Sequence, residues 1–292
     1  MSNPLFSIIT PSYNREHLIS VAIDSVLAQS YSNFELIIVD DGSTDNTADV
    51  VLKYTDARIK YFKKRNEERG AARNYGIRQS SGDYICFLDS DDIYYPNHLR
   101  SAADFIEDNE GAIFFYQPFE VEEKGVRKKQ AGFSGLSVRQ IADNNVLCPI
   151  GAFIKREVLM KHPFNTDPKF TIAEDLYLWL IIGIRHGIEL NDKYTSCLIN
   201  HDSRSMANLD PNRLIYCTHK LINLLKEDYE FSKHPDLINK VLASHYSLVS
   251  LYFSLIDKKI KAMNYLVMAF KINPYVMFRK RTIVIFKNLL LP

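Results

Sequence analysis

The chain has 292 residues, of which 46% are hydrophobic and 24% are charged, and its formal net charge is +1. This length allows one large α/β domain with a smaller appendage, or two domains, and the near-neutral charge gives no overall field that would attract nucleic acid. The four cysteines are far apart and contain no CxxC pair, which disfavours a disulfide framework or a zinc site and fits a reducing cytoplasm.

The first half of the chain alternates short apolar runs with helical patterns. Four runs are predicted strands: Leu5–Thr10, Phe34–Val39, Arg58–Phe62 and Tyr84–Leu88. Four segments are predicted helices: residues 14–30, 45–54, 70–80 and 96–108. Such alternation predicts a mostly parallel sheet covered by helices on both faces, with ligands at the carboxyl ends of the strands. The first run lacks a basic segment followed by a long apolar core, so it is predicted as a strand and not a signal peptide.

The second half is mixed at first and then helical. Residues 112–117 and 126–133 are predicted strands, and residues 173–186 are predicted to form a strong, buried helix. From Asp210 the pattern is all-helical: residues 211–229, 236–256, 259–272 and a last segment after Pro274. We therefore predict an α/β domain at residues 1–209 and a C-terminal helical region at residues 210–292. No uninterrupted apolar run approaches the ~18 residues of a membrane span.

Two acidic clusters follow predicted strands. Asp40-Asp41-Gly42-Ser43 ends the second strand, and Asp89-Ser90-Asp91-Asp92 ends the fourth. Neighbouring carboxylates repel one another unless a cation or donor groups compensate, and hard oxygen ligands suit Mg²⁺ or Mn²⁺. Taken alone, each cluster is also explained by a turn that caps the next helix, and for Asp89–Asp92 this is the favoured explanation. An EF-hand starting at Asp41 is excluded, because its glycine and glutamate positions hold Asn46 and Leu52.

Two further groups stand near predicted helix starts. Arg73 is expected in the first turn of the helix at residues 70–80, where the helix end and the guanidinium would both favour an anion. Glu174 and Asp175 open the helix at residues 173–186, either as first-turn residues favoured by the helix dipole or as a catalytic base. No G-x-G-x-x-G or Walker A sequence occurs, which disfavours a dinucleotide cofactor and a P-loop.

Together these segments resemble the family-two glycosyltransferases of the GT-A fold. The matching stretches keep the family's order and spacing over about residues 4–200: FSIITPSYNR, FELIIVDDGSTDNT, NEERGAARNYGI, SGDYICFLDSDD and, more loosely, FTIAEDLYLWL. The resemblance implies a GT-A sheet flanked by helices. It also implies inverting transfer of a sugar from a nucleoside-diphosphate sugar, assisted by Mn²⁺ or Mg²⁺.

The resemblance assigns roles to particular residues. Nucleotide binding falls to seven of them: Pro11, Tyr13, Arg15, Asp40, Asp41, Arg73 and Asp89. The catalytic and metal roles fall to four more: Asp175 as the base with Glu174 second, and Asp91 with His201 at the metal. His201 matches the histidine of an Arg-x-His pair that reaches the diphosphate in many relatives. The arginine position of that pair holds Ile199, and Arg204 is the candidate substitute.

These residue types suit the reaction. A carboxylate can deprotonate an acceptor hydroxyl, and a divalent ion can neutralise a leaving diphosphate. From the family resemblance we expect a UDP-linked donor and a glycan or lipid-linked acceptor in cell-surface polysaccharide synthesis. A sugar-nucleotide nucleotidyltransferase would need a glycine-rich loop, which Thr10–Asn14 lacks. A non-catalytic carbohydrate-binding protein is the other alternative, and the intact Asp41, Asp91 and Asp175 argue against it.

The C-terminal segment is strongly basic. Residues 258–292 contain eight Lys or Arg, no Asp or Glu, and many interleaved apolar residues. Such a segment favours attachment to an anionic membrane surface, although a helical bundle with a solvated basic face explains it too. We expect a cytoplasmic enzyme that is peripheral at the inner face of the plasma membrane and has no nucleic-acid partner.

Overall fold

The computed structural model describes residues 3–130, 135–200 and 209–290, and the chain divides into two compact units. The first, here called the sheet unit, comprises residues 1–137, 147–168 and 186–201. The second, here called the helical unit, comprises residues 138–146, 169–185 and 202–292. Two segments that precede residue 209 thus belong with the C-terminal helices, and a single domain boundary between residues 209 and 210 stays a prediction.

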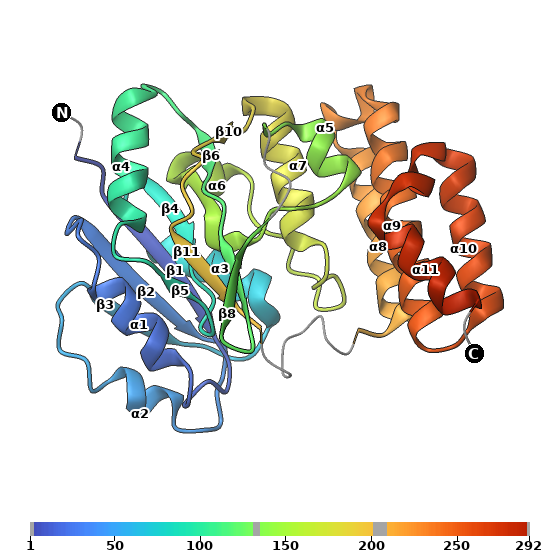
Figure 1. Cartoon of the computed structure of the whole chain (residues 1–292). Helices are drawn as coiled ribbons and strands as arrows, with labels where there is room; N and C mark the ends of the chain where they lie inside the picture. The colour runs from blue at the N-terminus through green and yellow to red at the C-terminus, as the bar shows by residue number, and fades with distance from the viewer. Residues whose placement is uncertain (1–2, 131–134, 201–208, 291–292) are drawn as a thin grey trace. The chain divides into compact units, whose positions relative to one another are not determined.

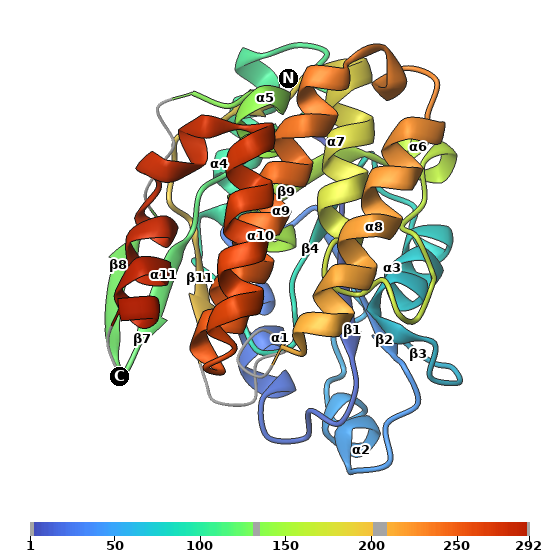
Figure 2. The ribbon, with the colours of Figure 1, turned by 90° about the vertical axis from the view of Figure 1, so that its right-hand side faces the viewer.

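Seven strands form the main sheet of the sheet unit, in the order β10-β6-β9-β4-β1-β2-β3 (Figure 1). Their bounds are β1 Phe6–Ser12, β2 Phe34–Asp40, β3 Ile59–Lys63, β4 Tyr84–Phe87, β6 Phe114–Tyr116, β9 Ala152–Lys155 and β10 Glu189–Leu190. Every pairing is parallel except those of β9, which runs antiparallel to β4 and β6. Helices α1 (Ile19–Leu27) and α3 (Glu68–Gln79) lie on opposite sides of β1 and β2 (Figure 2). The predicted fold, a mostly parallel sheet flanked by helices, is confirmed.

Burial explains why the central strands are continuous apolar runs. All seven residues of β2 are buried, as expected for a strand covered on both faces. Helix α3 approaches the sheet at Gly76, where an added Cβ would lie only 2.5 Å from Ile9 Cγ2. Near the amino ends, buried Glu35 accepts hydrogen bonds from Ser7 and Lys60. Burial raises the pKa of Glu35, but the hydrogen bonds from Lys60, Ser7 and the Ser81 backbone outweigh it and hold that pKa below its ordinary value.

Several elements differ from the sequence predictions. The helix expected at residues 14–30 begins only at Ile19, because Asn14 has φ +52° and belongs to a loop. A second sheet was not predicted: β5 (Ile93–Tyr94), β11 (Ser196–Ile199), β7 (Glu120–Glu123) and β8 (Val126–Lys129), in that order. The remaining helical segments of this unit are α2 Thr47–Val51, α4 His98–Asp108, η1 Pro149–Gly151 and α6 Arg156–Lys161. The part of the expected strand at residues 131–133 lies outside the described residues.

The helical unit contains the predicted helices with small shifts of their ends. Its elements are α5 Val138–Asp143, α7 Glu174–His186, α8 Pro211–Glu227, η2 Phe231–Lys233, α9 Pro235–Leu255, α10 Lys259–Ile272, η3 Pro274–Phe278 and α11 Lys280–Leu290. The core between α9, α10 and α11 includes Tyr246, Leu266 and Ile285. Across the part of the chain that the structure describes, no helix combines the length and apolarity needed to cross a bilayer.

Candidate active site

Three strand ends of the sheet unit bring together the residues that are predicted to bind the nucleotide-sugar donor. β1 lies between β2 and β4, and its last residue, Ser12, is in register with Asp40 at the end of β2. The Asp41 amide donates to the Ser12 carbonyl over 2.8 Å, which continues the pairing beyond the strand. On the other side, the Leu88 amide, which leads into Asp89, donates to the Ile9 carbonyl. The carboxyl edge of the sheet therefore gathers both acidic clusters, as parallel topology requires.

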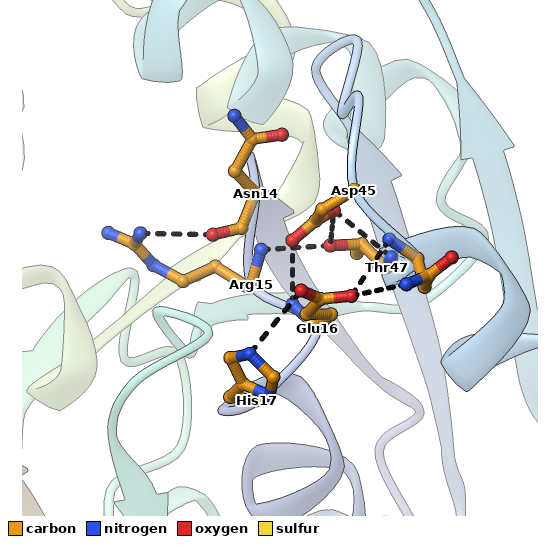
Figure 3. Close-up of polar contacts among 7 residues, drawn as sticks. Asn14, Arg15, Glu16, His17, Asp45 and Thr47 are labelled. Atoms are coloured by element: carbon orange, nitrogen blue, oxygen red, sulfur yellow. Dashed lines mark hydrogen bonds and ion pairs between the residues drawn. The ribbon is translucent and has the colours of Figure 1, made fainter.

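The loop after β1 is fastened to the loop after β2 (Figure 3). The Arg15 amide donates to Thr47 Oγ1 over 2.8 Å, and the Glu16 amide donates to Asp45 Oδ2 over 3.0 Å. Hydrogen bonds from the Thr47 amide and hydroxyl, together with that from the Glu16 amide, outweigh the effect of burial and lower the pKa of Asp45. The Arg15 guanidinium folds back to the Asn14 carbonyl at 3.3 Å. The two loops thus form one rim beside the strand ends.

The first three predicted nucleotide residues lie on or beside this rim. Pro11 is within β1 and partly exposed, and Arg15 is partly exposed as well. Tyr13 presents 46% of its surface to solvent. Their exposure at the strand end is compatible with contact to a base or ribose, and their assignment to the nucleotide stays a prediction.

The side chain of Asp40 stabilises the turn that follows β2. Its side chain is fully buried, Oδ1 accepts from the Ser43 amide at 2.7 Å, and Oδ2 accepts from the Tyr61 hydroxyl at 2.6 Å. Burial and this carboxylate raise the pKa of Tyr61 far above its ordinary value. Asp40 therefore shapes the loop on which the next residue stands, and its direct role in nucleotide binding stays a prediction.

Asp41 meets the loop that follows β3. Lys64 Nζ lies 2.6 Å from Asp41 Oδ1, and the Glu67 amide donates to the same carboxylate at 3.1 and 3.2 Å. Gly42 has φ +86°, and a Cβ there would lie 3.0 Å from the Asn66 amide nitrogen, so the two loops approach closely. Burial lowers the pKa of Lys64, but hydrogen bonds to Asp41 and Glu67 outweigh it and raise that pKa. The sequence analysis did not anticipate Lys64, because its role depends on this loop contact.

Arg73 is buried against the acidic cluster after β4. Helix α3 begins at Glu68 and not at residue 70, so the expectation that Arg73 occupies the first turn is wrong, and it lies in the second. Its side chain is 2% exposed, and Nη2 donates to Asp89 Oδ1 over 2.9 Å. Its guanidinium carbon also lies 5.4 Å from the centre of the Phe164 ring. Arg73 therefore holds Asp89, whose side chain remains 32% exposed.

The other two carboxylates of this cluster differ in exposure. Asp91 is partly exposed, whereas Asp92 is 2% exposed and accepts a hydrogen bond from the Ile199 amide at 3.0 Å. Asp92 thus ties the cluster to β11 of the second sheet. Within residues 3–130, 135–200 and 209–290, no group of three or more His, Cys, Asp or Glu side chains is arranged to hold a metal ion. The predicted metal residue His201 lies outside the described residues.

The donor set at this edge fits a divalent cation that arrives with a nucleotide. Asp89 and Asp91 offer partly exposed carboxylate oxygens at the end of β4. Mg²⁺ is usually held by one or two protein carboxylates, with phosphate oxygens and water as the remaining ligands. Two carboxylates that leave the other coordination positions to phosphate and water suit that mode of binding.

The predicted catalytic pair belongs to the helical unit. Glu174 and Asp175 open α7, as expected from the sequence. Glu174 is buried with 3% exposure, whereas Asp175 is partly exposed and its Oδ1 accepts from the Leu176 amide at 2.6 Å. The greater exposure of Asp175 suits the residue that would meet an acceptor, and both roles stay predictions.

Comparison with known proteins decides the family. The sequence profile described as "Glycosyl transferase family 2" matches residues 7–162, more than half of the chain. The chain belongs to glycosyltransferase family 2. A glycosyltransferase of Rickettsia conorii is 34% identical over 250 residues, which are 84% of this chain. The alignments cover only 35% to 41% of this relative and of two others, from Rickettsia felis and Rickettsia bellii, so the chain spans well under half of their length.

Two relatives carry names that specify a reaction. WfgD of Escherichia coli, named a UDP-Glc:alpha-D-GlcNAc-diphosphoundecaprenol beta-1,3-glucosyltransferase, is 38% identical over 186 residues, 62% of this chain and 71% of WfgD. The GalNAc(5)-diNAcBac-PP-undecaprenol beta-1,3-glucosyltransferase of Campylobacter jejuni is 28% identical over 272 residues, 89% of this chain and 86% of that enzyme. Both names describe glycosyltransferases, the class that the sequence analysis predicted for this chain.

Solved structures support the fold assignment. Staphylococcus aureus TarS 1-349 in complex with UDP-GlcNAc superposes with a TM-score of 0.72 at 22% identity, covering 98% of this chain and 88% of TarS. The mannosyltransferase PcManGT of Pyrobaculum calidifontis, in complex with GDP-Man and Mn²⁺, gives a TM-score of 0.58 at 15% identity, covering 100% of this chain and 88% of PcManGT. At these identities the likeness establishes the GT-A fold and not the substrates.

Proposed function

We propose that this glycosyltransferase moves a sugar, with inversion, from a UDP-sugar to a hydroxyl of a lipid-linked glycan in cell-surface polysaccharide synthesis. The observation that carries the proposal is the gathering of Asp41, Asp89 and Asp91 at the carboxyl edge of the sheet, beside a buried arginine. The UDP-linked donor named for WfgD, and the undecaprenol-linked acceptors named for WfgD and for the Campylobacter jejuni enzyme, support the choice of substrates.

The donor would lie over the ends of β1, β2 and β4. Asp41 would accept a hydrogen bond from the base, with Pro11, Tyr13 and Arg15 along the rim. Arg73 orients Asp89 through the 2.9 Å hydrogen bond, so that Asp89 and Asp91 would hold Mn²⁺ or Mg²⁺. When bound, such an ion neutralises the negative charge that develops on the leaving diphosphate. His201 would add to this site from outside the described residues.

The acceptor would be activated by a carboxylate of α7. Asp175 would take the proton of the acceptor hydroxyl as its oxygen forms a bond to the anomeric carbon. The bond from that carbon to the diphosphate breaks in the same displacement, and the electron pair leaves with the nucleoside diphosphate. Because attack comes from the face opposite the leaving group, the anomeric configuration inverts. Glu174, which is buried, would be second in this role.

We also propose that the enzyme works in the cytoplasm, peripheral at the inner face of the plasma membrane. An acceptor linked to undecaprenol, as named for two relatives, would be held in a bilayer. The basic segment at residues 258–292 would bring the enzyme to the lipid surface.

Donor binding gives the most direct test. The melting temperature should rise with UDP or a UDP-sugar in the presence of Mn²⁺ or Mg²⁺, because a ligand that binds the native state stabilises it by mass action. In the Asp91→Asn variant the contribution of the metal should disappear, whereas Asp104→Asn, an exposed carboxylate on α4, should behave as the wild type. A metal response that survives in Asp91→Asn, or transfer activity that is unchanged in EDTA, would contradict the assignment.

A further inference from the structure

Exposed apolar side chains are concentrated at the C-terminal end of the helical unit. Of the twenty large hydrophobic side chains exposed in the described residues, thirteen lie between Leu255 and Leu290. Phe278 is 85% exposed, Leu290 81%, Ile260 80% and Tyr275 76%. Scattered single residues of this kind are ordinary on a protein surface, but a dense group marks an interaction site.

The packing of the helices explains why these side chains are uncovered. α10 and α11 both lie against α9 and bury Leu266 and Ile285 there (Figure 2). Beside its buried residues, α10 presents an exposed apolar stripe at helical spacing: Ile260, Met263, Val267 and Phe270. The exposed side of α11 has Ile283 and Val284, and η3, which joins the two helices, has Tyr275 and Phe278. We call this set the C-terminal apolar surface.

The charges around this surface are lysines. Lys258, Lys261, Lys271, Lys280 and Lys287 are exposed, and residues 258–290 contain no acidic residue. The two arginines of the segment are turned inward instead. Arg279 pairs with Asp143 at 2.6 Å, and Arg281 donates to the Ser244 carbonyl at 3.1 Å.

We propose that the C-terminal apolar surface inserts into an anionic lipid bilayer, with Tyr275 and Phe278 of η3 as the principal anchors. The interspersed lysines complement anionic headgroups. They disfavour a second copy of this chain, because a two-fold contact would bring lysines against lysines with no acidic residue of the segment to pair with. This inference deepens the proposed membrane location, on which it rests for its biological role, by making apolar insertion and not charge alone the source of attachment.

Vesicle flotation of the 292-residue chain tests the proposal. Binding to phosphatidylcholine vesicles that contain phosphatidylglycerol should be strong and should weaken only in part at high salt, because salt screens charges but not apolar insertion. The double variant Tyr275→Ser/Phe278→Ser should bind at least about tenfold more weakly at every salt concentration. The matched control is Leu52→Ser/Tyr229→Ser, which removes side chains that are 65% and 74% exposed elsewhere and should bind as the wild type.

A second pair of variants separates charge from insertion. Lys271→Gln/Lys280→Gln/Lys287→Gln should lose the preference for anionic vesicles and keep the binding that resists salt. The control with the same change in charge, Lys53→Gln/Lys124→Gln/Lys128→Gln, removes three exposed lysines of the sheet unit and should retain that preference.

Three results would overturn the inference: no vesicle binding by the wild type, equal loss in both serine variants, or light scattering that shows a dimer abolished by Tyr275→Ser/Phe278→Ser. Donor binding, measured by thermal shift on the same proteins, should be unchanged in all four variants. If vesicle binding fails while donor binding remains, the surface proposal and the proposed membrane location fall, and the proposed transferase activity stands. If the protein binds vesicles but no nucleotide, the proposed function falls and the surface proposal stands.

Discussion

Replacing Lys64 with methionine removes the cation that faces Asp41 and keeps a side chain of similar length. The ion pair measures 2.6 Å, and its side chains are only 12% and 6% exposed. Lys64 also lies 2.8 Å from Glu67, but that carboxylate is 61% exposed, so solvent weakens its share of the interaction. The perturbation therefore acts mainly on Asp41.

The expected cost follows from this geometry. Removing one partner of a fully buried ion pair costs about 3–5 kcal/mol, and a hydrogen bond to a charged group contributes about 1.5–3 kcal/mol. Here the pair keeps some contact with solvent, and Asp41 retains the hydrogen bond from the Glu67 amide. We expect Lys64→Met to lower the free energy of unfolding by about 2–3 kcal/mol. It should also weaken UDP binding, because the Asp41 carboxylate would lose its fixed position.

Urea unfolding measured by circular dichroism gives the free energy. The only tryptophan, Trp179, lies in the helical unit, so its fluorescence reports separately whether that unit is affected. In a double-mutant cycle, Lys64→Met and Asp41→Asn should be coupled by at least about 1 kcal/mol. The control, Lys193→Met, breaks an ion pair whose side chains are 66% and 80% exposed and should change stability by no more than about 0.5 kcal/mol. A cost for Lys64→Met as small as that of the control, or no coupling to Asp41, would refute the reasoning.

Asp175→Asn should reduce turnover by about 10²–10⁴ and leave nucleotide affinity nearly unchanged. A large loss of nucleotide affinity would instead place Asp175 in the donor site. If only Glu174→Gln lowers turnover, Glu174 and not Asp175 is the catalytic base. The lowered pKa of Glu35 contributes stability that is present above its unfolded pKa, about 4.3, and is lost as the pH falls through the lower folded pKa. Urea midpoints of Glu35→Gln should therefore fall less steeply than those of the wild type below about pH 4.5. Asp92→Ala should lower the free energy of unfolding by about 1–3 kcal/mol, because the Ile199 amide loses its acceptor. The metal dependence of donor binding should remain. If that dependence is lost as in Asp91→Asn, Asp92 belongs to the metal site.

The central sheet was predictable because its strands are covered on both faces. A strand such as β2, buried at every position, must be a continuous apolar run, and such a run stands out in the sequence. The second sheet gives no such signal. β5 has two residues, too few to show a periodicity, and β8, which was expected as part of a strand at residues 126–133, is exposed at all four positions, so its pattern does not indicate a second sheet.

The positions of the acidic clusters were predictable, but their hydrogen-bond partners were not. Strand order places Asp41 at the carboxyl edge, whereas its contact with Lys64 depends on how two loops fold. The loop that carries Asp41 uses a backbone conformation that sequence periodicity does not specify, the positive φ of Gly42. Arg73 shows the same limit, since an error of two residues in the start of α3 moved it from the first turn to the second.

The three carboxylates after β4 show what the structure adds to a motif. Without the family resemblance, position in the sequence does not separate Asp89, Asp91 and Asp92, because each follows the same strand and each would be repelled by the others. In the structure the Ile199 amide donates to Asp92, which is buried, and the buried Arg73 guanidinium holds Asp89. Their environments therefore differ: Asp92 joins the two sheets, Asp89 is oriented by a fixed cation, and Asp91 is partly exposed at the edge. A motif lists the groups available for chemistry, and burial together with hydrogen-bond partners decides which of them remain accessible to a ligand.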